Sequence, residues 1–129
     1  MSSVLIIGGG AAGMMAAIAA GYNGNEVHLF EKNDRLGKKI FITGKGRCNV
    51  TNDSDVESLL SHVTRNPKFL YSAFYTWDSF LMQDFLEKEG LSLKTERGNR
   101  VFPASDHSSD VIRTLYSAMK KRGVTIYLH

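Results

Sequence analysis

Short apolar runs alternate with glycine-rich turns at the start of the chain. Val4–Ile7 is a continuous apolar run next to glycine, which is typical of a strand buried on both faces of a parallel sheet. The alanine-rich stretch from Ala11 to Ala20 predicts a helix that Gly21 ends, and Val27–Phe30 predicts a second strand. Strand, helix and strand within about 30 residues form a βαβ unit.

The hydrophobic period disappears after the second predicted strand. Residues 32–52 are rich in Gly, Lys, Thr and Asn, and we expect an ordered loop with apolar anchors at Ile40, Phe41 and Ile42. Residues 53–89 predict helices that Asn66-Pro67 interrupts. Asp78 is expected to cap the last of these helices.

Apolar side chains of this helical region are expected to face a core. In the helix after Asp78 the period of the sequence turns four of them inward, namely Leu81, Met82, Phe85 and Leu86. The aromatic residues before Asp78 recur at helical spacing and are expected in the same core: Tyr71, Phe74, Tyr75 and Trp77.

A hairpin and a second βα connection complete the predicted pattern. Leu91–Thr95 and Asn99–Phe102 flank a turn and predict the hairpin. Residues 110–122 predict an amphipathic helix, capped by Ser108 or Ser109 and ended by Gly123. Val124–Leu128 then predicts a third, buried strand of the parallel sheet.

The predicted fold is α/β, a Rossmann-like domain of order βα-β-insert-α-β. It consists of a βαβ unit (residues 1–31), a loop (32–52), a helical and hairpin insertion (53–107), and a helix with the third strand (108–129). Because an apolar run with no polar tail ends the chain, we expect the N-terminal part of a larger domain.

Composition narrows the class of protein. The 129 residues carry a formal net charge of +3, a mild excess that predicts no nucleic-acid partner without a clustered basic face. The apolar runs are too short to span a bilayer, so no membrane association is expected. With Cys48 as its one cysteine the chain forms no internal disulfide, which favours the cytoplasm, and the scattered histidines predict no metal site.

The turn between the first predicted strand and helix carries the pattern G-x-G-x-x-G. Gly8 permits the tight turn, Gly10 lets the backbone approach a pyrophosphate, and Gly13 lets the helix pack on the strand. The start of the helix then offers free N–H groups and the positive end of its dipole to phosphates.

Glu31 follows the second predicted strand, where a carboxylate can accept hydrogen bonds from a ribose diol. A 2′-phosphate would be repelled there, which disfavours NADP. NAD and FAD both remain open on these residues, because both present an ADP half. S-adenosylmethionine enzymes share the turn and the acid but usually carry an acidic residue entering the turn, whereas Leu5-Ile6-Ile7 has none.

A second motif separates these alternatives. Gly37 to Asn52 contains a Gly-Lys-Lys step followed by Thr-Gly-x-Gly-Arg-Cys-Asn-x-Thr-Asn, and Gly98 to Ser105 contains G-x-x-F-P-x-S. With the glycine turn and Glu31-Lys32, these segments resemble the bacterial NAD(P)/FAD-dependent oxidoreductases of the aminoacetone-oxidase-like type. The resemblance covers essentially the whole chain.

The resemblance implies FAD bound in an extended form across a Rossmann-like domain. It places Gly8, Gly10, Ala11, Ala12 and Gly13 on the pyrophosphate, and Glu31 on the adenosine ribose with Lys32 nearby. It also implies a group between pyrophosphate and flavin: Lys38, Lys39, Thr43, Gly44, Gly46, Arg47, Cys48 and Asn49.

The implied function is that of a flavin-dependent oxidoreductase acting on a small-molecule substrate, with NAD(P)H as a possible electron donor. An NAD-linked dehydrogenase and a non-catalytic flavin- or nucleotide-binding module are the alternatives. No residue is a convincing general acid or base, although the basic neighbours of Cys48 predict some thiolate character. Because members of such a family are several times longer, we expect the remainder of the polypeptide to complete the site, and this chain alone to be inactive.

Overall fold

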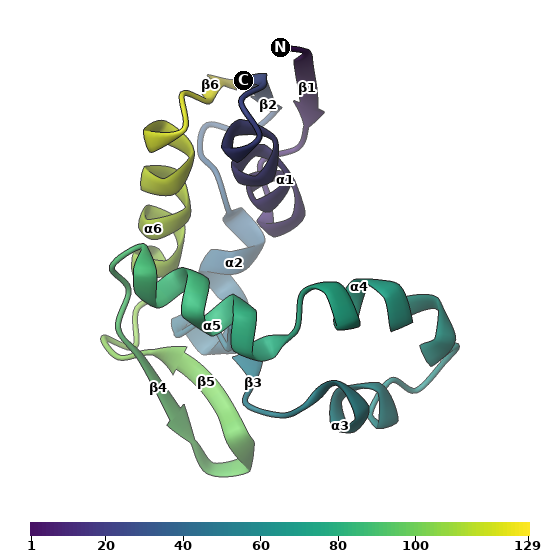
Figure 1. Ribbon diagram of the computed structural model, residues 1–129. Helices are drawn as coiled ribbons and strands as arrows, with labels where there is room; N and C mark the ends of the chain where they lie inside the picture. Colours follow the sequence, from purple (N-terminus) through teal and green to yellow (C-terminus); the bar gives the residue numbers. More distant parts are fainter. The chain divides into compact units, whose positions relative to one another are not determined.

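The computed structural model describes residues 1–129, which form two compact units. The first unit combines Met1–Cys48 with His107–His129, and the second is the continuous segment Asn49–Asp106. Figure 1 shows the elements of both units along the chain. The predicted fold class is confirmed: a parallel sheet with helical crossovers receives a helical and hairpin insertion.

The first unit is built on a three-stranded parallel sheet of order β1-β2-β6. Its strands are β1 (Ser3–Ile7), β2 (Glu26–Glu31) and β6 (Thr125–Leu128). The crossover from β1 to β2 is α1 (Ala11–Tyr22), and α6 (Ser108–Lys121) precedes β6. Ile7 pairs with Phe30 in the register of the sheet, and Phe30 pairs with Tyr127.

Helices α1 and α6 supply the apolar side chains that pack with one face of this sheet. Val27 and Leu29 of β2 are buried, as are Met14 of α1 and Met119 of α6. Burying a side chain of this size stabilises the fold by about 1.5–3 kcal/mol. Gly21 belongs to this packing rather than to a cap: α1 continues to Tyr22, and a Cβ at Gly21 would come within 2.9 Å of the Arg122 side chain.

The other face of the parallel sheet is open to solvent. Leu5 and Ile7 of β1 are 66% and 83% exposed, and Phe30 of β2 and Tyr127 of β6, which share this face, are also exposed. The prediction that these strands are buried on both faces is therefore wrong for this chain, because its helices leave this face uncovered.

Two shorter elements follow β2. They are α2 (Lys38–Ile42) and a 3-10 turn at Thr43–Gly46. Of the three expected apolar anchors only Ile40 is buried, while Phe41 and Ile42 are exposed. The predicted cap of α6 is also wrong: His107 is the N-cap and its side chain makes no capping bond, and the Ser108 hydroxyl instead donates to the Phe41 carbonyl at 2.7 Å.

The second unit holds an antiparallel sheet of order β3-β5-β4. Its strands are β3 (Thr51–Asn52), β4 (Leu93–Glu96) and β5 (Arg100–Pro103), and the last two form the predicted hairpin. Its helices are α3 (Val56–Ser61), α4 (Tyr71–Thr76) and α5 (Ser79–Lys88), with 3-10 turns at Pro67–Leu70 and Arg97–Asn99.

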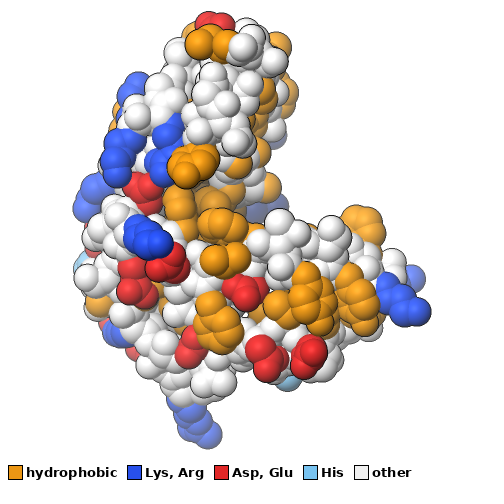
Figure 2. Space-filling model, viewed as in Figure 1, with side chains coloured by type: hydrophobic (Ala, Val, Ile, Leu, Met, Phe, Trp, Pro, Cys, Tyr) orange, Lys and Arg blue, Asp and Glu red, His pale blue; other side chains and the backbone are white.

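The predicted N-cap at Asp78 is confirmed, whereas the prediction that the apolar residues of α4 and α5 face a core is wrong for most of them. The Asp78 carboxylate accepts a hydrogen bond from the Leu81 amide at 2.8 Å, as an N-cap does. Leu86 is fully buried, but Leu81 is exposed, as are Tyr71, Tyr75 and Trp77. Figure 2 shows hydrophobic side chains on the surface over α4. The predicted aromatic core is wrong because α4 is only six residues long and presents most of these rings to solvent.

No helix of the structure combines the length and the apolar character needed to cross a bilayer.

Candidate functional site

The glycine turn lies between β1 and α1, and two of its glycines are required by its own geometry. Gly8 adopts a φ of +104°, which L side chains rarely adopt, and its amide donates to the Phe30 carbonyl at 2.8 Å. A Cβ on Gly13 would overlap the carbonyl oxygen of Gly8. Any side chain at position 13 therefore pushes α1 away from the turn.

Gly10 differs from these two because nothing inside the protein requires it. It is the N-cap of α1 in an extended conformation (φ −87°, ψ −166°), and no atom lies within 4 Å of where its Cβ would stand. No side chain caps the helix, so the amides of Ala11, Ala12 and Gly13 face the space in front of it. This space has the geometry and the polarity of an anion site.

Glu31, the last residue of β2, is held against the turn. Its Oε1 accepts a hydrogen bond from the Gly9 amide at 2.8 Å, and its Oε2 accepts one from the Asn33 amide at 2.7 Å. These two bonds, the Gly9 bond above all, hold the pKa of Glu31 below its usual range. The carboxylate is ionised at neutral pH, and both oxygens keep a lone pair for a ligand.

Gly9 is a residue whose role the sequence reasoning missed. A Cβ at this position would collide with the Leu36 side chain and come within 3.2 Å of the Glu31 Cβ. The close approach of the backbone here is what lets the amide reach the carboxylate. The signal in the sequence is the uninterrupted Gly8-Gly9-Gly10, of which the middle residue is a free position in the G-x-G-x-x-G pattern.

The start of α2 is bound to the same turn. The Gly37 amide donates to the Gly9 carbonyl at 2.9 Å, and Gly37 has a φ of +68°. Lys38 pairs with Asp34 at 3.4 Å, and Arg35 pairs with the same carboxylate at 3.5 Å. Arg35 and Lys38 lower the pKa of Asp34 through their hydrogen bonds to its carboxylate. The side chains of Lys32 and Lys39 are exposed to solvent. The structure thus bonds the backbone of Gly37, just before the predicted Lys-Lys step, to the glycine turn.

The loop from Thr43 to Cys48 closes on itself through backbone bonds. The Cys48 amide donates to the Thr43 carbonyl at 3.0 Å, and the Arg47 amide donates to the Gly44 carbonyl at 3.1 Å. Gly44 and Gly46 have positive φ values, as do Lys45 (57°) and Cys48 (60°). The left-handed conformation costs a residue with a side chain about 1–2 kcal/mol. The backbone hydrogen bonds of the loop therefore keep Lys45 and Cys48 in a conformation that is unfavourable for each of them alone.

Cys48 is buried, at 6% exposure, and burial raises the pKa of its thiol. A hydrogen bond with Thr43 acts in the opposite direction but is the smaller effect. The prediction of thiolate character from the neighbouring basic residues is therefore wrong, because desolvation disfavours the charged form. The side chain is a neutral, weakly donating thiol.

Asn49, the last residue of the predicted flavin-side group, belongs to the second unit. Oriented to satisfy its neighbours, its side-chain amide donates to the carbonyls of Val101 at 3.2 Å and Thr51 at 3.0 Å. These bonds join β3 to β5. Its assignment to the cofactor stays a prediction.

An apolar groove of about 380 Å³ lies in the first unit. Its apolar lining comes from α2, α6, the loop after β2 and the end of β6, namely Leu36, Phe41, Ile112, Tyr116 and Leu128. Leu128 pairs with Glu31 in the sheet register. The groove therefore provides apolar surface beside the strand end that carries the carboxylate. No group of three or more His, Cys, Asp or Glu side chains is arranged to hold a metal ion.

Comparison with known proteins identifies the family. The sequence profile of the HI0933-like protein Rossmann domain matches residues 2–129. The chain belongs to this family. The predicted membership of a flavin-dependent oxidoreductase family is thereby confirmed.

Two proteins whose names state an activity are similar to this chain in sequence. The chain is 34% identical to 3-dehydro-bile acid delta(4,6)-reductase of Clostridium scindens over 129 residues, which cover 98% of the chain and 31% of the relative. It is 32% identical to the ribosomal RNA dihydrouridine synthase of Escherichia coli over 124 residues, which cover 96% and 30%. The chain spans under a third of the length of these relatives.

Solved structures show the same fold at lower identity. The chain superposes on the Thermovibrio ammonificans THI4 structure with a TM-score of 0.65 at 16% identity, covering 98% of the chain and 38% of that structure. It superposes on the open conformation of a flavocytochrome c3 fumarate reductase with a TM-score of 0.59 at 24% identity, covering 99% and 27%.

Proposed function

We propose that residues 1–129 form the FAD-binding part of a flavin-dependent oxidoreductase. The observation that carries this proposal is the hydrogen bond from the Gly9 amide to Glu31, which fixes an ionised carboxylate beside the uncapped start of α1. A dinucleotide needs both groups at once, the amides for its diphosphate and the carboxylate for a ribose diol.

The diphosphate is assigned to the turn. Gly8 and Gly13 shape it, Gly10 leaves room in front of it, and the amides of Ala11, Ala12 and Gly13 meet the phosphate oxygens. The adenosine ribose is assigned to Glu31, whose negative charge repels a 2′-phosphate. The apolar groove beside β6 offers a surface for the adenine ring.

The residues between the diphosphate and the flavin ring are assigned from the family motif. We assign the following residues to this part of the cofactor: Lys32, Lys38, Lys39, Thr43, Gly44, Gly46, Arg47, Cys48 and Asn49. Gly44 and Gly46 expose backbone amides, and Arg47 supplies a permanent positive charge for phosphate or for a reduced, anionic ring. The protonated thiol of Cys48 acts as packing and as a weak donor. When bound, FAD supplies two-electron redox chemistry, and the protein supplies binding, orientation and electrostatics.

The reaction we propose is the reduction of an unsaturated small molecule. The names of both relatives describe reductions, one of a bile acid and one that yields a dihydro form of uridine in ribosomal RNA. NAD(P)H is the proposed electron donor. Since the chain carries no convincing acid or base, the groups that act on the substrate are assigned to the rest of the polypeptide.

The test is made on the full-length protein that contains this chain. We expect it to be yellow as purified, to release FAD on denaturation, and to lose its visible absorbance when NADH or NADPH is added without oxygen. A colourless protein that releases NAD would establish the NAD-linked dehydrogenase instead. A yellow protein that no reductant bleaches would establish a binding module.

A further inference from the structure

The short helix α2 is held at its two ends by different parts of the first unit. Just before it, the Gly37 amide donates to the Gly9 carbonyl at 2.9 Å, and a Cβ at Gly37 would come within 2.9 Å of the Ile112 side chain of α6. At its other end the Phe41 carbonyl accepts the hydroxyl of Ser108 at 2.7 Å. Because a helix of five residues is not stable alone, contacts of this kind decide where α2 lies.

Ser108 is the first residue of α6 and lies 67 positions after Phe41 in the chain. It is 2% exposed, and among polar residues only Ser79 is buried to a similar degree. A serine at the start of a helix ordinarily serves that helix, but the hydroxyl of Ser108 bonds to the end of α2. The last carbonyls of a helix have no partner within it, so Ser108 supplies the partner that the Phe41 carbonyl needs.

The end of α2 leads directly into Thr43–Cys48, which we call the flavin-side loop. The Thr43 hydroxyl donates to the Ile40 carbonyl at 2.7 Å, and the Cys48 amide donates to the Thr43 carbonyl at 3.0 Å. Ile40 is the buried residue of α2. Since the loop is bonded to α2 through Thr43, a displacement of the end of α2 displaces the loop and the Arg47 that it carries.

We infer that Ser108 is a positioning residue for FAD. It does not contact the cofactor; through the Phe41 carbonyl it fixes the flavin-side loop relative to the glycine turn, to which the start of α2 is bonded. The inference rests on the proposed function, which assigns the turn and the loop to one FAD molecule. A ligand that spans two groups binds tightly only when both are held in the right geometry before it arrives.

The substitution Ser108→Ala in the full-length protein tests the inference, because it removes the donor that the Phe41 carbonyl uses. In the flavin-free protein we expect iodoacetamide to label Cys48 about tenfold faster than in the wild type, since the loop opens more often. When FAD is added, we expect its dissociation constant to be about tenfold higher than that of the wild type.

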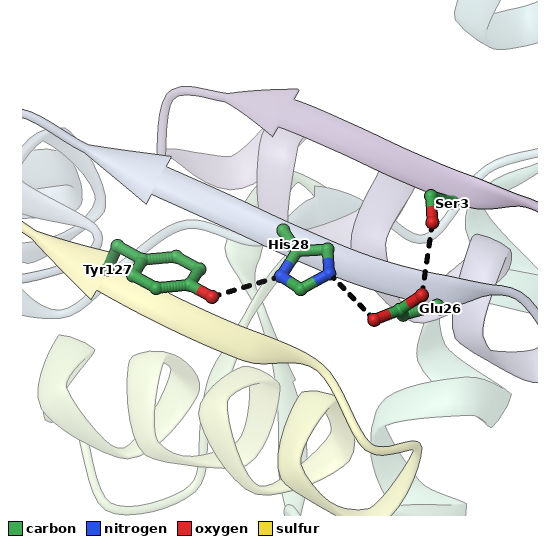
Figure 3. Close-up of polar contacts among 4 residues, drawn as sticks. All are labelled: Ser3, Glu26, His28 and Tyr127. Carbon is green, nitrogen blue, oxygen red and sulfur yellow. Dashed lines mark hydrogen bonds and ion pairs between the residues drawn. The ribbon is translucent and has the colours of Figure 1, made fainter.

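Two other serines are matched controls for a general loss of stability. Ser79 is the first residue of α5 and is 3% exposed, and its hydroxyl lies 3.1 Å from that of Thr51 and 3.2 Å from the Gln83 amide nitrogen. Ser3 belongs to the first unit, and its hydroxyl donates to Glu26 at 3.0 Å in the group of contacts that Figure 3 shows. Ser79→Ala and Ser3→Ala should leave the labelling rate and the FAD affinity within about twofold of the wild type.

The midpoint potential of the bound FAD is a readout that a change of stability alone does not move. The guanidinium of Arg47 is always charged and favours a reduced, anionic flavin. Because Ser108→Ala displaces the flavin-side loop, we expect the potential of this variant to be more negative than that of the wild type. The potential of Ser79→Ala should equal that of the wild type.

Three results would overturn the inference. In the first, Cys48 of Ser108→Ala is labelled at the wild-type rate, which means that the hydroxyl does not hold the loop. In the second, the three serine variants change labelling and FAD affinity equally, which means that the effect is general. In the third, the loop opens but the FAD affinity and the potential stay at their wild-type values, which means that the loop does not serve FAD.

Failure of the proposed function is a different result. A wild-type full-length protein that binds no FAD would contradict that proposal. The labelling of Cys48 requires no flavin, so it decides in either case whether Ser108 holds the loop.

Discussion

The amide of Gly9 donates a hydrogen bond to the carboxylate of Glu31, 22 positions further along the chain, at 2.8 Å. The bond joins the turn after β1 to the end of β2. It exists because Gly9 has no side chain to separate the backbone from Leu36 and Glu31. Both parts of a dinucleotide site, the amides and the carboxylate, are thereby fixed before any ligand arrives.

Substituting Glu31 tests the role of the carboxylate. We expect Glu31→Gln to lower the FAD affinity of the full-length protein by about tenfold, since a carboxylate binds a ribose diol more strongly than an amide does. Titration of the apoprotein with FAD measures the effect. Glu26→Gln, at the other end of the same strand, is the control, and an equal loss in both variants would show that the effect is general.

The pH dependence of stability follows from the same carboxylate. Its pKa is lowered in the folded state, so the contribution of its bonds is present above the ordinary carboxyl pKa and is lost as the pH falls through the folded value. Because the group is solvent-accessible, we expect less than about 1 kcal/mol. Urea unfolding of the wild type and Glu31→Gln should differ most at neutral pH and converge as the pH falls from the ordinary carboxyl range through the lowered pKa of the folded state. A difference that grows toward acid would contradict this sign.

Gly13→Ala should break the turn itself. The added Cβ overlaps the Gly8 carbonyl oxygen, which is backbone and has little freedom to move. We expect a loss of about 1–3 kcal/mol of unfolding free energy, as for overpacking elsewhere. Thermal and urea unfolding of the full-length protein measure it, and a variant as stable as the wild type would show that the turn has another conformation.

The core beneath the sheet gives a prediction independent of any ligand. Leu29 is fully buried, so Leu29→Ala should cost about 2–5 kcal/mol. Leu81→Ala, the same change at an exposed position of α5, should cost no more than about 0.5 kcal/mol. Equal costs at the two positions would contradict the packing described here.

Cys48 should react slowly with alkylating reagents. Its thiol is buried and its pKa is raised, so at pH 7 the thiolate fraction is below that of a free cysteine. Iodoacetamide labelling followed by mass spectrometry measures the rate in the folded and the unfolded protein. Faster labelling of Cys48 in the folded protein would show that the surrounding basic residues control its titration after all.

The local part of this structure could be predicted from the sequence. The glycine pattern, the βαβ unit and the hairpin depend on residues near one another in the chain, and so does the Asp78 cap. The tight turn at Gly8, whose φ is +104°, was predicted in the same way from the glycine pattern.

What the sequence did not predict depends on contacts between distant segments. Leu5 and Ile7 have the composition of a buried strand, but their burial requires a layer that the chain does not supply. The thiol of Cys48 is controlled by burial, which charge counting along the chain overlooks. The role of Gly9 depends on Leu36 and Glu31, and only the folded chain brings those side chains to it.

The substitution Gly10→Ala tests the central claim most directly, because position 10 accepts a Cβ in the protein but not beneath a bound diphosphate. The measurement is the FAD content of the purified full-length variant, with its unfolding curve as the check on folding. We predict a variant as stable as the ligand-free wild type whose flavin content falls by about tenfold or more, a loss of at least about 1.4 kcal/mol of binding free energy. A folded Gly10→Ala protein that keeps a full complement of FAD would contradict the assignment of the turn to the diphosphate.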